Sequence, residues 1–119
     1  MGKEEAEGVM EKTERLDLRE LQIMARRVSD IYAQNFDVNR DAAWYLGKLT
    51  EELGEVSSAF LKTSGRGRGE VGHEALADEM ADLFGFLLLF ADWQGIDLET
   101  AFRRKWGQYL EASHERHDT

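Results

Sequence analysis

Apolar residues recur every three or four positions along four segments of this chain, which is the period of an amphipathic helix. The pattern predicts helices over residues 14–36, 42–62 and 73–93, and a fourth helix from residue 98 onward. Apolar and polar residues nowhere alternate for long enough to predict a β-strand. The sequence therefore predicts an all-α fold built from four helices.

Capping residues and glycines mark the breaks between these helices. Asp41 is placed to cap the second helix, Gly95 to end the third and Asp97 to cap the fourth. The run TSGRGRGEVG separates the second helix from the third and contains four glycines in ten residues. It predicts a flexible loop that carries Arg66 and Arg68.

The third helix is the most apolar of the four. Its core-facing side is predicted to carry Leu76, Met80, Leu83 and Leu87. Residues 84–91 are apolar almost all round, which predicts that both sides of the helix are covered. A chain of this size cannot cover them alone, so we expect a homodimer or a homotetramer.

Composition sets further bounds. The 119 residues suffice for one domain, predicted over residues 13–117, after a polar and flexible stretch at 1–12. The absence of proline fits long helices, and the absence of cysteine excludes disulfides and thiolate chemistry.

No apolar run approaches the ~18 residues of a membrane span, and the acidic start is unlike a signal peptide. We expect a cytoplasmic protein without a membrane partner. The net charge of −9 disfavours binding to a nucleic-acid duplex.

Two acidic clusters lie within the second and third helices. In each, two of three carboxylates are three positions apart and project from one side of a helical turn. The clusters are Glu51, Glu52 and Glu55, and then Asp78, Glu79 and Asp82. Facing helices with such carboxylates would form an all-oxygen site of the kind that holds Mg²⁺ or Mn²⁺. The alternative is a solvated helix face that carries these charges by chance, which two pairs on consecutive helices disfavour.

The order and spacing of these two acidic clusters resemble those of a known protein family. The pattern EExxE followed by ExxD, with the run DExxDLFxFLL, resembles the all-α nucleoside triphosphate pyrophosphatases. These are the MazG-like nucleotide pyrophosphohydrolases, which include dimeric dUTPases, dCTP pyrophosphatases and phosphoribosyl-ATP pyrophosphatases. The resemblance covers about residues 20–112. It implies a four-helix MazG-like bundle completed by oligomerisation, and Mg²⁺-dependent hydrolysis of a nucleoside triphosphate to monophosphate and pyrophosphate. The implied role is the removal of noncanonical or surplus nucleotides.

The resemblance also implies site residues. The implied metal ligands are Glu52, Glu55, Glu79 and Asp82. Glu51 and Asp78 are candidates to orient or activate water, together with Glu52. The candidate phosphate contacts are Lys48, Arg66, Arg68, Arg104 and Lys105. Trp44 is a candidate base contact, although a tryptophan here also fits the core or an interface. The Lys-x-x-x-Asn pattern of many members is not kept, because Tyr109 stands where Asn would.

The expected chemistry needs no covalent nucleophile. Metal ions screen the triphosphate and lower the pKa of a bound water, and a nearby carboxylate orients that water. Two other functions stay open. A di-iron or di-manganese redox bundle would need histidines that face inward, which the sequence does not supply. A non-enzymatic helical interaction module would not need all four carboxylates.

Overall fold

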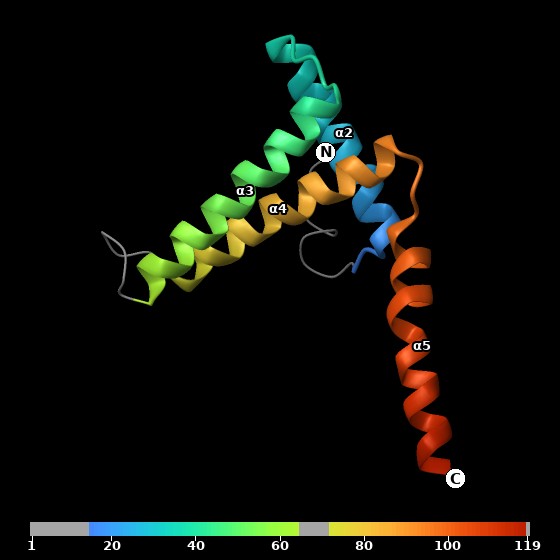
Figure 1. The fold of residues 1–119 in the computed structure, drawn as a ribbon. Coiled ribbons are helices and arrows are strands. Elements are labelled where there is room, and N and C mark those ends of the chain that lie inside the picture. Colours follow the sequence, from blue (N-terminus) through green and yellow to red (C-terminus); the bar gives the residue numbers. More distant parts are fainter. Residues whose placement is uncertain (1–14, 65–71, 119) are drawn as a thin grey trace, which may run out of the picture.

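The computed structural model of the protein describes residues 15–64 and 72–118, and all regular structure in these ranges is helical. The helices are α2 (Leu18–Phe36), α3 (Ala42–Thr63), α4 (His73–Trp93) and α5 (Leu98–Asp118). Helices α3 and α4 run side by side as an antiparallel pair, α2 crosses α4, and α5 projects away from the other three (Figure 1). The all-α prediction is confirmed. No helix in the described ranges is both long and apolar enough to cross a bilayer.

The first helix starts later than the sequence pattern predicted. Asp17 has an extended backbone, and its carboxylate accepts a hydrogen bond from the Glu20 N–H at 2.8 Å. The Glu20 carboxylate in turn accepts from the Asp17 N–H at 2.9 Å, which completes a capping box. This reciprocal cap begins the helix at Leu18, whereas the sequence analysis had predicted a start at residue 14.

The other predicted caps are confirmed. The Asp41 carboxylate accepts from the Trp44 N–H at 2.9 Å and starts α3. Gly95 follows the last turn of α4 with a φ of 70°, a left-handed conformation that glycine adopts without strain. Asp97 caps α5 by accepting from the Glu99 N–H at 3.1 Å.

The core of the single chain is small. Its buried apolar residues are Tyr45, Ala59, Leu88, Leu89 and Ala91. The Tyr45 ring stacks on the Trp93 ring with the ring centroids 4.5 Å apart. A few residues of α3 and α4 therefore hold the helix pair together.

The predicted core face of α4 is wrong in part. Met80 and Leu87 are 55% and 42% exposed, whereas Leu88 and Leu89 are buried inside the chain. Because residues 83–91 are apolar except for Gly85, the sequence does not fix the rotation of the helix about its axis. Packing against α3 on one side and α2 on the other selects the buried face.

A buried glutamine attaches the start of α5 to α2. Gln22 is 4% exposed, and its Nε2 donates to the Ile96 carbonyl at 3.0 Å. Its Oε1 accepts from the Leu98 N–H at 3.2 Å. Both amide atoms are thus used to hold the turn between α4 and α5, and the rest of α5 extends beyond this anchor (Figure 1).

Candidate metal centre and adjoining groove

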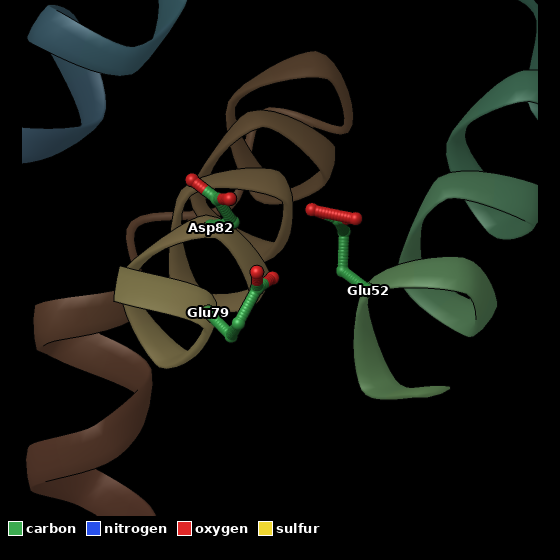
Figure 2. A group of neighbouring side chains, drawn as sticks. All are labelled: Glu52, Glu79 and Asp82. Carbon is green, nitrogen blue, oxygen red and sulfur yellow. The ribbon is translucent and has the colours of Figure 1, made fainter. Parts of the chain in front are cut away.

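Three carboxylates meet between α3 and α4. Glu52, Glu79 and Asp82 each offer an oxygen, and these oxygens all lie within 4.8 Å of one another. Figure 2 shows Glu79 and Asp82 on α4 with Glu52 of α3 directed toward them. The antiparallel pairing of the two helices therefore brings together acidic residues that are nearly thirty positions apart in the sequence.

The electrostatics of this cluster favour a bound cation. Burial raises the pKa of Glu52, and the negative charges of Asp82, Glu51 and Glu79 raise it further. The Lys48 ammonium acts in the opposite direction. The ionised form of Glu52 is thus less stable here than that of a free glutamate, as expected when like charges share a site. A divalent cation would remove this repulsion, and carboxylate oxygens are the ligands that Mg²⁺ and Mn²⁺ prefer. These residues therefore fit such an ion.

Lys48 lies beside the cluster, one turn before Glu52 on α3. Its Nζ pairs with the Glu51 Oε1 at 3.1 Å and lies 5.7 Å from the centroid of the Phe86 ring. The sequence analysis named this lysine as a candidate phosphate contact, and the structure gives Glu51 as its ion-pair partner. The ion pair with Glu51 and the Phe86 ring hold the ammonium beside the cluster. They do not use all three of its N–H donors.

An open groove of about 730 Å³ adjoins the cluster and is lined by α2, α3 and α4. Trp44, Lys48, Glu52 and Asp82 all line it. The Trp44 ring meets the ring of Phe86, which also lines the groove, edge to face at 5.9 Å between centroids. The groove therefore combines carboxylates, one ammonium group and several aromatic rings.

Part of this groove was not foreseen from the sequence. Phe86 and the α2 residues Met24 and Val28 line it, whereas the sequence showed Met24 and Val28 only as positions of the helical apolar period. A periodic stripe shows only that a face avoids water, and not whether a core, a ligand or another chain covers it.

Comparison with known proteins agrees with this geometry. A model of the family described as phosphoribosyl-ATP pyrophosphohydrolase matches residues 18–104. The chain belongs to the phosphoribosyl-ATP pyrophosphohydrolase family. Because this family has the MazG-like all-α pyrophosphohydrolase domain, the resemblance seen in the sequence is confirmed. Among curated proteins and among solved structures, none matches the chain.

Three acidic residues expected in the site lie outside the three-carboxylate cluster. Glu51, Glu55 and Asp78 are exposed, and none of them belongs to the group of converging oxygens. Glu55 follows Glu52 by three positions on α3, so it remains on the same side of that helix.

Two of the predicted basic contacts, both on α5, are not brought to the cluster within one chain. Arg104 and Lys105 are exposed on α5, whose main contact is with α2 and which leads away from the α3–α4 pair (Figure 1). Arg66 and Arg68 lie outside the described residues. Lys48 is therefore the one positively charged side chain among the described residues that line the groove.

Proposed function

We propose that the chain is a Mg²⁺-dependent nucleoside triphosphate pyrophosphohydrolase, which cleaves its substrate to a nucleoside monophosphate and pyrophosphate. The observation that carries this proposal is the convergence of Glu52, Glu79 and Asp82 beside a groove that also holds Lys48. Family membership supports a hydrolase that acts on pyrophosphate bonds. Mn²⁺ is expected to substitute for Mg²⁺ because it accepts the same oxygen ligands.

The proposal gives each residue around the groove a role. Glu52, Glu79 and Asp82 hold the ion, and Glu55 joins them by turning about its own side-chain bonds. A bound ion supplies charge screening for the triphosphate and a water of lowered pKa. Lys48 holds a phosphate oxygen, since the same ammonium can serve Glu51 and a phosphate together.

Two further carboxylates, Glu51 and Asp78, are proposed to orient the attacking water. Both lie next to a ligand in the sequence, and both are exposed to solvent in the single chain. Trp44 and Phe86 offer aromatic surface on which a base can lie. The groove is open, which suits a substrate with both an apolar base and a charged tail.

The substrate class extends to phosphoribosyl-ATP, because this compound names the family whose model matches. It is itself a nucleoside triphosphate, so it presents the same triphosphate to the same carboxylates. If the protein prefers ordinary or modified triphosphates to phosphoribosyl-ATP, the role that we propose is the removal of noncanonical nucleotides.

The redox bundle and the interaction module are weaker candidates. In the part of the chain that the structure describes, no histidine joins the three carboxylates, and di-iron bundles use such histidines. An interaction module would have no reason to keep charges that repel one another across two helices. Metal analysis of protein purified without added metal separates the redox bundle from the hydrolase.

A pyrophosphate-release screen tests the proposed function. The purified protein is incubated with Mg²⁺ and a panel of canonical (d)NTPs, modified (d)NTPs and phosphoribosyl-ATP. We expect release from at least one substrate, and no release by Asp82→Asn, which retains the fold but loses a charged ligand. Equal release by Asp82→Asn would contradict the assignment of the cluster.

A further inference from the structure

Ser29 of α2 carries a buried hydroxyl whose proton has no acceptor in the part of the chain that the structure describes. The side chain is 7% exposed and lines the groove beside the acidic cluster. Its Oγ accepts a hydrogen bond from the Arg40 guanidinium at 2.9 Å. A serine hydroxyl also has one proton to donate. Because a buried donor without an acceptor costs free energy, Ser29 indicates a ligand that supplies one.

Arg40 restricts the direction in which this hydroxyl can donate. The Arg40 Nη1 that bonds the Ser29 oxygen also pairs with the Asp30 Oδ1 at 2.8 Å, so the guanidinium is held in place. Since the guanidinium occupies one lone pair of the Ser29 oxygen, the hydroxyl proton points away from Arg40. A hydroxyl that accepts from a cation is polarised and becomes a better donor. Ser29 is therefore arranged to donate to a group in the groove.

Ser29 lies toward the end of the groove that is farther from the carboxylates. Its partner Arg40 stands just before α3 and precedes Trp44 by four positions. Trp44 in turn precedes Glu52 by eight positions, which is about 12 Å along the helix. Both Trp44 and Glu52 line the groove. A nucleotide whose triphosphate lies at Glu52 therefore directs its base toward Trp44 and Ser29.

The surroundings of Ser29 in the groove are mostly apolar. Apart from Lys48 and the carboxylates, the lining side chains with a polar atom are Ser29, Tyr32 and Trp44. Of these three, Ser29 alone is buried, whereas Tyr32 is 52% exposed. A site that hydrogen-bonds one group of a substrate discriminates against an analogue that lacks it, because the buried partner is then left unpaired. The Ser29 proton is therefore placed to discriminate between bases.

We propose that Ser29 selects the base of the nucleotide by donating a hydrogen bond to it, and that Arg40 is the residue that positions Ser29. The favoured base presents an oxo oxygen, which accepts a hydrogen bond, where adenine or cytosine presents an amino group, which donates one. Hypoxanthine and uracil are bases of the favoured kind. The inference rests on the proposed function, because the triphosphate at the carboxylates determines which end of the groove the base occupies.

Substrate pairs that differ in an exchange of oxo for amino test this selection. The pairs are ITP with ATP and dUTP with dCTP, and kcat/KM is measured for each with saturating Mg²⁺. In the wild type we expect the oxo member of each pair to be preferred roughly 10-fold, which is the effect of about one hydrogen bond. In Ser29→Ala the ratio should fall close to one. A change that merely loosens the packing would lower kcat/KM for both members and leave their ratio unchanged.

Two further variants accompany Ser29→Ala. Ser58→Ala removes a hydroxyl from an exposed position of α3 outside the groove, so it should keep the wild-type ratio. Arg40→Met frees the Ser29 hydroxyl to rotate and should lower the ratio in part, and a full wild-type ratio in this variant would overturn the positioning role. An unchanged ratio in Ser29→Ala, or a wild type that prefers the amino members or neither, would overturn the selection by Ser29.

Binding measurements separate this inference from the proposed function. The α,β-imido analogues of dUTP and dCTP cannot be cleaved between the first two phosphates, and calorimetry with Mg²⁺ gives their affinities. We expect the dUTP analogue to bind roughly 10-fold more tightly to the wild type, and both analogues to bind equally to Ser29→Ala. If no substrate releases pyrophosphate but this difference is found, the proposed function fails and the base selection stands. Equal affinities in the wild type, or binding of neither analogue, would overturn the inference.

Discussion

Glu52 is the residue on which the site depends most. It comes from α3, whereas the other two members of the cluster come from α4. Glu52 is therefore the only one of the three converging carboxylates that α3 contributes. Burial and the adjacent carboxylates raise its pKa, which means that its charge destabilises the metal-free fold. The same feature that costs stability without metal would favour the binding of a divalent ion.

Glu52→Gln should therefore separate activity from stability. We expect pyrophosphate release to fall roughly 100-fold or more, because a bound ion contributes several kcal/mol to such reactions. The metal-free melting temperature should rise or stay level, since the mutation removes a repelled charge. Mg²⁺ should raise the melting temperature of the wild type but not of the variant. Glu74→Gln, an exposed glutamate on α4 outside the cluster, is the control and should behave as wild type in both measurements.

Lys48 is expected to act on the substrate rather than on the metal. Lys48→Ala should lower kcat/KM roughly 10-fold to 100-fold, because a hydrogen bond to a charged group contributes about 1.5–3 kcal/mol. The Mg²⁺ affinity, measured by calorimetry, should change little or become tighter. Steady-state kinetics at saturating Mg²⁺ decide the role, and wild-type kinetic constants in the variant would leave Lys48 only its ion pair with Glu51.

At the scale of the element, the sequence predicted most helix boundaries because side chains close in sequence set them. Asp41 and Asp97 cap the helices that follow them, and Gly95 takes the left-handed conformation expected after α4. The start of α2 was misplaced because the sequence offers a second helix-start signal, Thr13 before Glu14, upstream of the reciprocal cap at Asp17. The pairing of Glu52 with Glu79 and Asp82 was also predictable, since two helical turns with like charges need a common partner.

Rotations and directions of helices could not be predicted in the same way. The buried face of α4 is chosen by contacts with α2 and α3, and its apolar run allows several rotations. The direction of α5 depends on Gln22, a polar residue on α2 whose partners are more than seventy positions away in the sequence. No local pattern gives such a contact, so Arg104 and Lys105 were expected at a site that their helix does not reach within one chain.

Gln22→Ala should loosen the attachment of α5. It leaves the Ile96 carbonyl and the Leu98 N–H without their partner in a partly buried turn, at a cost of about 1 kcal/mol. Urea denaturation measures this loss in the free energy of unfolding. Gln34→Ala, on an exposed position of the same helix, is the matched control and should change stability by less than about 0.5 kcal/mol. Equal effects of the two substitutions would show that the two hydrogen bonds of Gln22 contribute nothing to the free energy of unfolding.

At the scale of the whole molecule, the apolar surface exceeds what the chain buries. Only five apolar residues of the described ranges are buried, and large apolar side chains stay exposed on all four helices. The oligomer expected from the sequence remains a proposal. Only part of the run at 84–91 is available for such a contact, because Leu88 is buried inside the chain whereas Phe84 is 42% exposed.

Charged substitutions on α4 should distinguish the core from the interface. Leu88→Asp places an unpaired charge in the core and should abolish cooperative unfolding, as followed by circular dichroism. Phe84→Asp should keep the helical spectrum but lower the mass measured by light scattering. A Phe84→Asp protein with the wild-type mass would mean that this rim of the groove faces solvent in the assembly.

The identity of the reaction products tests the central claim most directly. The substrate chosen by the screen is incubated with the protein and Mg²⁺, and the products are resolved by ³¹P NMR. The metal-bound carboxylate site predicts equal amounts of nucleoside monophosphate and pyrophosphate, no reaction in EDTA, and recovery on adding Mg²⁺ or Mn²⁺. Formation of a diphosphate and inorganic phosphate, or cleavage that continues unchanged in EDTA, would contradict the proposed function.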